Sequence, residues 1–340
     1  MTKSQNNTPI AVGIDDGYAY TKIALPDGRL CAIPSRACIG QSSVTWINQA
    51  VQRVFEYETE DTTYSVGMVD GAPTRFEGYP VSGLNRVIVQ HALQDIGLSG
   101  QTIHAVSGLP VNAFYRNNGE LRREAIQKKQ DSLKQSVHVR SEALPVGISF
   151  HEVIPEALAA WYDYVIVEQG GDATLDTDRR SVPVAIIDIG GRTTDYVVVK
   201  DQGIIHGSSG SLQCGMLDVK QKVADGIQER FDLETISEQR VAHALETGSV
   251  RLHGKDFDVG RLVDHAKKEV VERLLVETRR QLGMGIELDR ILFVGGGTVA
   301  LVEHISDWFP HQVIAEHPAF ANARGMLKYL RYVCEGSMAA

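Results

Sequence analysis

Two aspartates in this sequence, each two residues before a glycine, could hold a ligand that carries phosphate. Asp188 stands near the end of the apolar run 184–189 and is followed by Gly190 and Gly191. Glycines allow a tight turn and bring bare N–H groups close to an anion, and the hydroxyl of Thr193 adds a donor. A turn of this kind, with a carboxylate beside it, is typical of a phosphate-binding hairpin.

The same plan occurs near the start of the chain. The apolar strand 11–14 leads into Asp15 and Gly17, and the stretch 21–25 forms the returning strand. A third glycine turn follows the apolar strand 291–294 and leads into a predicted helix. It consists of Gly295, Gly296 and Gly297. Three such turns in one chain are more informative than one.

Around these turns the sequence alternates strands with helices, which predicts an α/β protein. The segments 83–96, 264–282 and 320–332 are predicted helices, with apolar residues every three or four positions. A long helix is predicted to start from 208–211, and another to run over 155–167. One phosphate hairpin falls in each half of the chain, so we expect two α/β domains that face each other across a nucleotide cleft.

Length, charge and cysteine usage limit the function classes. A chain of 340 residues exceeds one ordinary core, which favours two domains. A formal net charge of −9 argues against a protein that holds DNA over its whole surface. The four cysteines have no C-x-x-C spacing, no apolar run approaches the roughly 20 residues of a spanning helix, and the start shows neither signal nor anchor. We therefore expect a cytoplasmic protein with reduced thiols and no membrane contact.

The order of the motifs resembles the actin, Hsp70 and sugar-kinase superfamily. The resemblance rests on IDDG at 14–17, PEA at 155–157, IIDIGGRTTD at 186–195, FVGGG at 293–297 and NARGM at 322–326. Within the superfamily, the sequence is most similar to the plasmid-segregation ATPase family ParM/StbA. The stretch LPVNAFYRNN at 109–118, the charged segment after it, and VIPEA at 153–157 carry this similarity, which extends from about residue 10 to 332.

The resemblance implies an actin-like, ribonuclease H-like fold with the nucleotide cleft between two domains. Domain I is expected over 9–180 plus 320–334, with a small inserted subdomain at about 34–80. Strands are predicted over 51–57 and 63–67 within that insert. Domain II is expected over 181–319, with an inserted subdomain at about 212–285.

The resemblance also implies a nucleotide, ATP or GTP, bound with Mg²⁺. Asp15 and Asp188 would hold the ion mostly through its water ligands, since magnesium gives up water reluctantly. Lys22, seven residues after Asp15, would lie against the phosphates. The simpler interpretations are an Asx turn at each aspartate and a surface lysine on a strand.

Further nucleotide contacts are expected at the three glycine turns. Gly17, Gly190, Gly191 and Thr193 would contact the phosphates, and the triple glycine would let the adenosine lie flat against the backbone. Tyr18, in the first turn, stands where smaller residues are usual in relatives. Lys220, on the long helix, matches a position that contacts ribose and base in relatives, although an exposed helical residue is the alternative.

Glu156 is the predicted catalytic residue, together with Asp188. In phosphoryl transfer, positioning and charge neutralisation supply most of the rate, so one well-placed carboxylate that orients the attacking water can suffice. Glu156 is expected in the first turn of the helix 155–167, where an acidic residue is often a simple helix-dipole partner. Asp195 could support the same network.

The resemblance implies an ATPase that polymerises head to tail and segregates plasmid DNA through a DNA-binding adaptor bound to a centromere-like site. Hydrolysis would destabilise the filament. The acidic net charge agrees with an adaptor in place of strong direct DNA binding, and the charged stretch 116–140 lacks interleaved aromatics, which favours a solvated, partly filament-contacting helix. Another bacterial actin-like assembly ATPase, or a small-molecule kinase of the superfamily, is the alternative.

Overall fold

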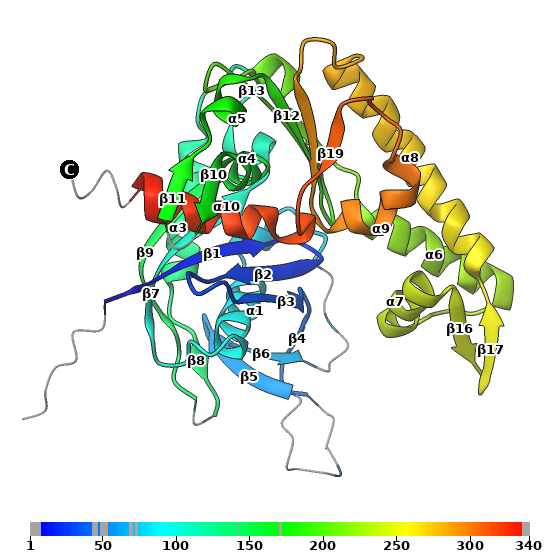
Figure 1. Ribbon diagram of the computed structural model, residues 1–340. Helices are drawn as coiled ribbons and strands as arrows, with labels where there is room; N and C mark the ends of the chain where they lie inside the picture. Colours follow the sequence, from blue (N-terminus) through cyan, green and yellow to red (C-terminus); the bar gives the residue numbers. More distant parts are fainter. Residues whose placement is uncertain are drawn as a thin grey trace, which may run out of the picture. The chain divides into compact units, whose positions relative to one another are not determined.

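The structure is a computed structural model (Figure 1), and it describes residues 8–42, 47, 54–67, 71, 74–141, 143–169 and 172–334. The chain divides into two compact units. One comprises Met1–Ser181 and Phe320–Ala340, and the other comprises Val182–Ala319. No helix in the described ranges is long and apolar enough to cross a membrane. None of the four cysteines, all of which lie in those ranges, forms a disulfide.

A five-stranded sheet with the order β3–β2–β1–β7–β9 lies at the centre of the first unit. β1 and β2 form the predicted antiparallel hairpin, and β7 and β9 follow parallel to β1. The central strand β1 is buried from Val12 onward, as an almost continuous apolar strand requires when both faces of its sheet are covered. The bounds are β1 Ile10–Asp16, β2 Tyr20–Ala24, β3 Leu30–Pro34, β7 Thr102–Leu109 and β9 Gly147–Pro155.

Helix α1, Gly83–Asp95, confirms the helix predicted over 83–96. It is buried nearly all round because it packs on two sheets: Val89 and Leu93 contact the five-stranded sheet, and Leu84 and Ile88 contact a four-stranded sheet. The strand order of this second sheet is β4–β6–β5–β8. Its strands are β4 Ala37–Ile39, β5 Val54–Thr59, β6 Thr62–Gly67 and β8 His138–Val139. Residues 51–53 of the predicted strand 51–57 lie outside the described residues.

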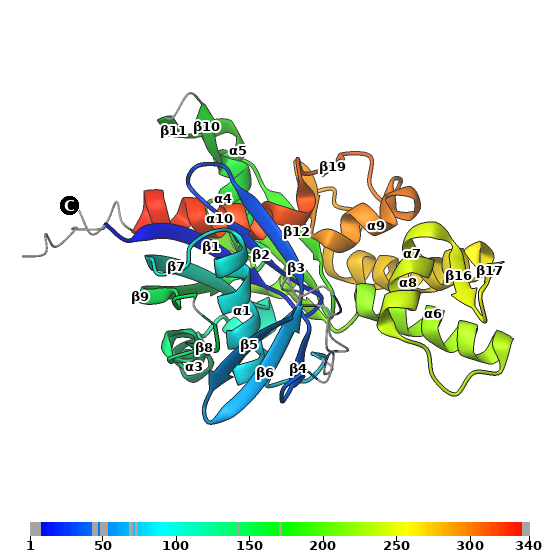
Figure 2. The same ribbon diagram turned by 90° about the horizontal axis from the view of Figure 1, so that it is seen from below.

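Helices α4, Leu158–Val165, and α10, Ala321–Tyr329, pack together against the five-stranded sheet (Figures 1 and 2). α10 lies directly on neighbouring backbone. A Cβ on Gly13 of β1 would overlap the carbonyl oxygen of Ala323, and a Cβ on Gly325 would overlap that of Ala159. Glycine at these two positions therefore permits the close packing of the predicted C-terminal helix.

The helix predicted over 155–167 is wrong at both ends. Pro155 is the last residue of β9, Glu156 lies in a turn, and α4 begins only at Leu158. The reason is that parallel pairing with β7 extends as far as Leu109 opposite Pro155, so the sheet holds the backbone in an extended conformation up to that point. From Ile166 the chain enters strand β10.

The remaining elements of the first unit are short, apart from the charged helix α3. They are η1 Tyr79–Val81, α2 Val111–Phe114, α3 Arg123–Lys134, β10 Ile166–Gln169, β11 Asp172–Leu175, α5 Thr177–Ser181 and η4 Leu330–Cys334. A further short helix, η3 Pro318–Phe320, leads into α10.

The second unit repeats the sheet plan of the first. Its main path is β14–β13–β12–β18–β19, with the hairpin β12–β13 antiparallel and β18 and β19 parallel to β12. A short strand, β15, also pairs with β13. The bounds are β12 Val184–Ile189, β13 Thr194–Lys200, β14 Gly203–Ile204, β15 Gly210–Leu212, β18 Arg290–Val294 and β19 Gln312–Ile314.

Helices α6, α8 and α9 bury one face of this sheet in a single apolar core, with Val223, Leu274 and Leu301 among its members. The long helix predicted from 208–211 starts later, at Met216, because the preceding residues pair with β13 as β15. The predicted helix 264–282 is the larger part of α8. The bounds are η2 His206–Ser208, α6 Met216–Phe231, α7 Glu238–Thr247, β16 Ser249–Leu252, β17 Lys255–Asp258, α8 Gly260–Leu282 and α9 Gly296–Ile305.

His151 of β9 is a buried polar residue of the first unit. Its Nε2 lies 2.8 Å from the hydroxyl of Ser107, and its Nδ1 lies 3.1 Å from the carbonyl oxygen of Gln130. A neutral ring satisfies both contacts, with Nδ1–H donating to the carbonyl and Nε2 accepting from the hydroxyl. Burial is the main cause that lowers the pKa of His151 to about 4.

We predict that this histidine makes stability depend on pH. An unfolded histidine has a pKa of about 6.5, so the unfolded state binds more protons below that pH, and the free energy of unfolding should fall by about 2 kcal/mol between pH 7 and pH 5 through His151 alone. His151→Gln keeps a donor and an acceptor and should lose correspondingly less, measured by urea unfolding at both pH values. An equal loss in the two proteins would contradict this assignment.

Candidate functional site

The register of the first hairpin brings Asp15 and Lys22 together. The two residues lie opposite each other on β1 and β2, and Lys22 Nζ donates to Asp15 Oδ2 at 2.8 Å. Both side chains are largely buried, with exposed fractions of 13% for the lysine and 7% for the aspartate. The ion pair offsets the cost of removing the carboxylate from water.

Side chains from neighbouring segments hold the turn that follows Asp15. The carbonyl oxygen of Gly17 accepts from Ser35 Oγ at 2.6 Å, and that of Tyr18 accepts from Thr74 Oγ1 at 2.6 Å. The Tyr18 ring packs on Tyr79 with ring centroids 5.1 Å apart. The large residue at position 18 is therefore used in packing, and the turn backbone is fixed in orientation.

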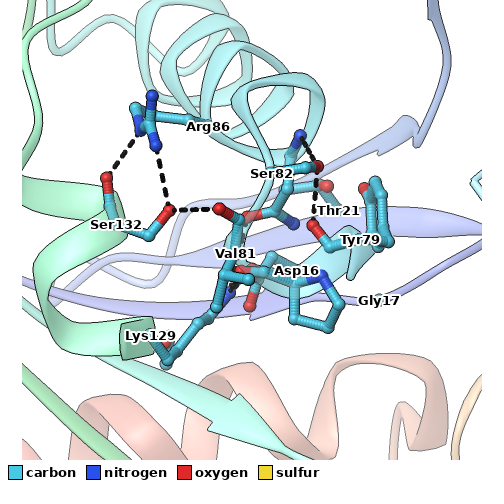
Figure 3. A network of polar contacts seen from close by, with 12 residues as sticks. Asp16, Gly17, Thr21, Tyr79, Val81, Ser82, Arg86, Lys129 and Ser132 are labelled. Carbon is cyan, nitrogen blue, oxygen red and sulfur yellow. Dashed lines mark hydrogen bonds and ion pairs between the residues drawn. The ribbon is translucent and has the colours of Figure 1, made fainter. Parts of the chain in front are cut away.

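Asp16 forms a second, fully buried ion pair with Lys129 of α3 (Figure 3). Lys129 Nζ also donates to the carbonyl oxygen of Pro80 at 2.8 Å and to Asn85 Oδ1 at 3.4 Å. A buried ammonium group is tolerated only when a carboxylate and further acceptors surround it in this way. The pair fixes the end of β1 to α3 and to the start of α1.

The same network continues through Ser132 and Arg86 (Figure 3). Ser132 Oγ donates to the carbonyl oxygen of Val81 at 3.0 Å, and Arg86 Nε donates to the carbonyl oxygen of Ser132 at 2.6 Å. Arg86 Nη1 donates to Thr59 Oγ1 of β5 at 2.7 Å. Lys129 and Ser132 thus bind the neighbouring carbonyl oxygens of Pro80 and Val81, and Arg86 connects Ser132 to the four-stranded sheet.

In the second unit, Asp188 lies near the end of β12, and Gly190 and Gly191 begin the turn to β13. The carbonyl oxygen of Gly190 accepts from Met216 N at 3.1 Å, and that of Gly191 accepts from Leu217 N at 2.8 Å. The turn therefore rests on the first amide groups of α6, and Thr193 closes it by accepting from Gly190 N at 2.9 Å.

Asp195 lies directly opposite Asp188 in this hairpin. Opposed carboxylates on neighbouring strands repel each other unless one of them is neutralised or hydrogen-bonded. Ser211 Oγ of β15 donates a hydrogen bond to Asp195 Oδ1, and Asp195 is almost fully buried. Both aspartates are therefore positioned by the sheet.

The triple glycine lies against the second hairpin. Gly295 has a φ of +89°, and a Cβ there would overlap Asp188 Oδ1 and the carbonyl oxygen of Ile189. A Cβ on Gly297 would lie 2.7 Å from the same carbonyl oxygen, whereas Gly296 has nothing within 4 Å of its Cβ position. Gly295 and Gly297 are thus required by close packing, and Gly296, the first residue of α9, lies beside open space.

Glu156 lies immediately after β9 and its amide donates to the carbonyl oxygen of Leu109 at 2.8 Å. Its side chain lies over Gly108 of β7, where a Cβ would be 2.8 Å from Glu156 Cγ. The first-helical-turn position predicted for Glu156 is wrong, for the reason of sheet pairing given above. The residue is instead fixed at the carboxyl ends of two parallel strands, where ligands commonly bind in α/β sheets.

Lys220 of α6 forms an ion pair with Glu238 of α7, with Nζ 3.0 Å from Oε1. It is partly exposed, so its predicted contact with ribose and base stays a prediction. The first unit brings Asp15, Gly17, Tyr18 and Lys22 together on one hairpin. The second unit brings Asp188, Gly190, Gly191 and Thr193 together on another, with Gly295 and Gly297 against it. Asp15 and Asp188 belong to different units, so their shared magnesium ion also stays a prediction.

Sequence reasoning missed Asp16 and Lys129 as members of the first site. The second aspartate of IDDG was an available signal, because two adjacent carboxylates on a strand point to opposite faces and require separate partners. Lys129 offered no comparable signal, since it stands within a run of charged residues that is solvated for the most part.

Sequence comparisons agree with this arrangement. A family model described as the N-terminal part of the plasmid segregation protein ParM matches residues 10–166, and one described as the C-terminal part of an archaeal MreB-like actin homologue matches residues 186–307. A curated archaeal actin homolog from Thermoplasma acidophilum is 23% identical, over 93% of this chain and 97% of its own.

Solved structures show the same fold. The ParM of a 15-stranded filament from Clostridium botulinum gives a TM-score of 0.74 at 18% identity, with 95% of this chain and 99% of that chain covered. An archaeal actin homolog in complex with ADP gives a TM-score of 0.71 at 20% identity, with 93% and 97% covered. The chain is therefore a mixed α/β protein with an actin-like fold. Within this class, residues 10–166 are similar to the plasmid segregation protein ParM and residues 186–307 to the archaeal MreB-like actin homologue.

We predict that a variant with both Asp16 and Lys129 replaced is more stable than either single variant. Asp16→Asn or Lys129→Met alone leaves one buried charge without its partner and should cost about 3–5 kcal/mol of unfolding free energy. The combined variant removes both charges and should recover most of that loss in urea unfolding. If the double variant lost as much unfolding free energy as the two single variants together, a direct pairing would be contradicted.

Proposed function

We propose that this protein is a cytoplasmic ATPase that forms nucleotide-dependent filaments and segregates plasmid DNA through a DNA-binding adaptor. The observation that carries the proposal is the duplicated hairpin: each unit holds a buried aspartate at the end of a central strand, followed by a glycine turn. The ADP complex of an actin-like relative supports an adenine nucleotide as the ligand.

The residues of the two hairpins suit a magnesium-bound triphosphate. Within the described residues, no cluster of three or more His, Cys, Asp or Glu side chains could bind a metal directly. Two carboxylates, Asp15 and Asp188, suit an ion that keeps much of its water shell and takes its remaining ligands from phosphate. When bound, Mg²⁺ would neutralise phosphate charge. Lys22 would add a positive charge, and the amides of Gly17 and Gly191 and the hydroxyl of Thr193 would donate hydrogen bonds. Gly190, whose amide donates to the carbonyl oxygen of Thr193, would let the turn approach the phosphate closely.

Glu156 is the proposed residue that orients the attacking water, with Asp188 as the second catalytic carboxylate. The backbone before Glu156 is fixed by the pairing of β7 with β9, and Gly108 leaves room for the Glu156 side chain. A positioned carboxylate can hold a water in line with the phosphate and accept its proton as the bond forms.

Filament formation is proposed from the similarity of residues 10–166 to ParM. A head-to-tail contact is heterologous and does not close, so subunits add without limit, and nucleotide hydrolysis would weaken that contact. With a net charge of −9, the subunit is suited to reach DNA through an adaptor and not by its own surface. The charged face of α3 is a candidate for contacts within the filament.

A second candidate is an actin-like filament protein without a plasmid role. It is favoured by the match of residues 186–307 to an archaeal MreB-like family and by the archaeal relative that covers nearly the whole chain. A plasmid-stability assay distinguishes the two. Loss of a low-copy plasmid on deletion of this gene supports segregation, and stable inheritance supports the second candidate. A third class, a small-molecule kinase, would require ATP turnover that is stimulated by a sugar and no pelleting with nucleotide.

We predict that Glu156→Gln separates binding from hydrolysis. The amide keeps the shape but cannot accept a proton, so phosphate release should slow by about 10²–10⁴-fold, while nucleotide affinity changes little and polymers persist longer. Phosphate release and sedimentation with Mg-ATP, Mg-ADP and no nucleotide measure this. Glu168→Gln, which changes a partly exposed carboxylate that binds Arg331, is the matched control. Normal turnover in Glu156→Gln would overturn the catalytic assignment.

We also predict opposite behaviour for two neighbouring glycines. Gly295→Ala forces a Cβ against Asp188 and Ile189 at a positive φ and should destabilise the second unit by about 2 kcal/mol or more. Gly296→Ala meets open space, so the protein should stay as stable as the unaltered chain but bind adenine nucleotide at least about ten-fold more weakly if adenosine lies on this glycine. Thermal unfolding and nucleotide titration distinguish the effects. Unchanged affinity in Gly296→Ala would place adenosine elsewhere.

A further inference from the structure

The chain makes a rare backbone turn directly after Glu156. Ala157 has φ +61° and ψ −42°, and Leu158 N donates to the carbonyl oxygen of Glu156 at 2.7 Å. These angles with a hydrogen bond between the first and third residues define a γ-turn of the strained kind, which is rare. Ala157 is fully buried and is not glycine, so the surrounding structure must hold it in this conformation.

The group that holds the turn comes from the far end of the sequence. Asn322 Oδ1, on the first turn of α10, accepts a hydrogen bond from Ala157 N at 3.1 Å. Asn322 is 5% exposed, so the contact is shielded from water. This N–H belongs to the peptide group that joins Glu156 to Ala157. The contact with Asn322 therefore fixes the orientation of that peptide group.

The helix that carries Asn322 is itself firmly placed. Ala323 lies directly on Gly13 of β1, and Arg324 donates to Asp163 of α4 with Nη2 2.6 Å from Oδ2. Lys328 Nζ lies 2.8 Å from the other oxygen of Asp163. The position of Asn322 is therefore set by β1, which also carries Asp15, and by α4, which follows the turn.

From these contacts we propose that Asn322 is a positioning residue for Glu156. It acts through the amide of Ala157 and keeps the turn in the conformation that aims the Glu156 side chain over Gly108. The inference rests on the proposed catalytic role of Glu156. It explains why asparagine, with a carbonyl oxygen at this distance, begins the NARGM motif, and it connects the C-terminal helix to hydrolysis without contact with the nucleotide.

The test uses the full chain and the variant Asn322→Leu, which has a similar shape but no acceptor. We expect kcat for phosphate release to fall by about 10–100-fold, since displacement of a catalytic group by about 1 Å can cost that much. The dissociation constant for ADP should change by less than about three-fold. Asn322→Asp keeps the acceptor, and a negative charge is favourable in the first turn of a helix, so this variant should retain near-normal kcat.

Two controls separate positioning from a merely structural role. Leu330→Ala removes a fully buried side chain just after the end of α10, and it should lower the unfolding temperature while kcat at 25 °C falls by less than about three-fold. In the Glu156→Gln background, Asn322→Leu should reduce kcat by less than about two-fold, because residues that act as a unit are not additive. If Asn322→Leu is unstable, Asn322→Ala provides the same comparison.

The outcomes distinguish this inference from the proposed function. Slow hydrolysis in Glu156→Gln with normal kcat in Asn322→Leu would overturn the role of Asn322 alone. Normal hydrolysis in Glu156→Gln would overturn the proposed function of Glu156. Equal kcat losses in Asn322→Leu and Leu330→Ala, or full additivity with Glu156→Gln, would show that Asn322 acts only on stability.

Discussion

The register of two antiparallel hairpins is the constraint on which the other features depend. In each hairpin the residue seven positions after the aspartate lies directly opposite it, which places Lys22 opposite Asp15 and Asp195 opposite Asp188. Side chains opposite each other on such strands are neighbours on one face. The same backbone geometry therefore gives an ion pair in one unit and a pair of carboxylates in the other, where a serine hydroxyl bonds to Asp195.

Buried charge explains much of the structure around the first hairpin. Removing a carboxylate from water costs several kcal/mol unless a partner compensates it. Asp15 and Asp16 follow each other on β1, so they point to opposite faces and need different partners, Lys22 on the neighbouring strand and Lys129 on α3. Through its further contacts with Pro80 and Asn85, Lys129 also holds η1 and the start of α1 beside the glycine turn. The residues that compensate the buried carboxylates therefore also fix the positions of the helices that carry them.

Close backbone packing determines the structure at the two glycine-containing motifs, as buried charge does at the first hairpin. In FVGGG, Gly295 and Gly297 allow the chain to pass beside β12, and Gly296 is left facing open space. In NARGM, Gly325 allows α10 to lie on α4, and Asn322 then reaches the turn after β9. Motifs that look alike in composition thus divide into residues needed for packing and residues available to a ligand or a neighbouring turn.

The local features could be predicted from the sequence, because they depend on residues that are near in the chain. The hairpins at Asp15 and Asp188, the glycine turns, helix α1 and the larger part of α8 follow from apolar runs, periodicity and glycine chemistry, and the order of motifs indicated the actin-like α/β fold. The other features depend on contacts between residues that are distant in the chain. Pairing with β7 kept Pro155 extended and moved Glu156 out of a helix, pairing with β13 delayed the start of α6, and the partners of Asp16 and Ala157 come from 113 and 165 residues away. Contacts at such separations leave no periodic pattern in the sequence, since any residue of suitable chemistry can supply them once the fold brings it close.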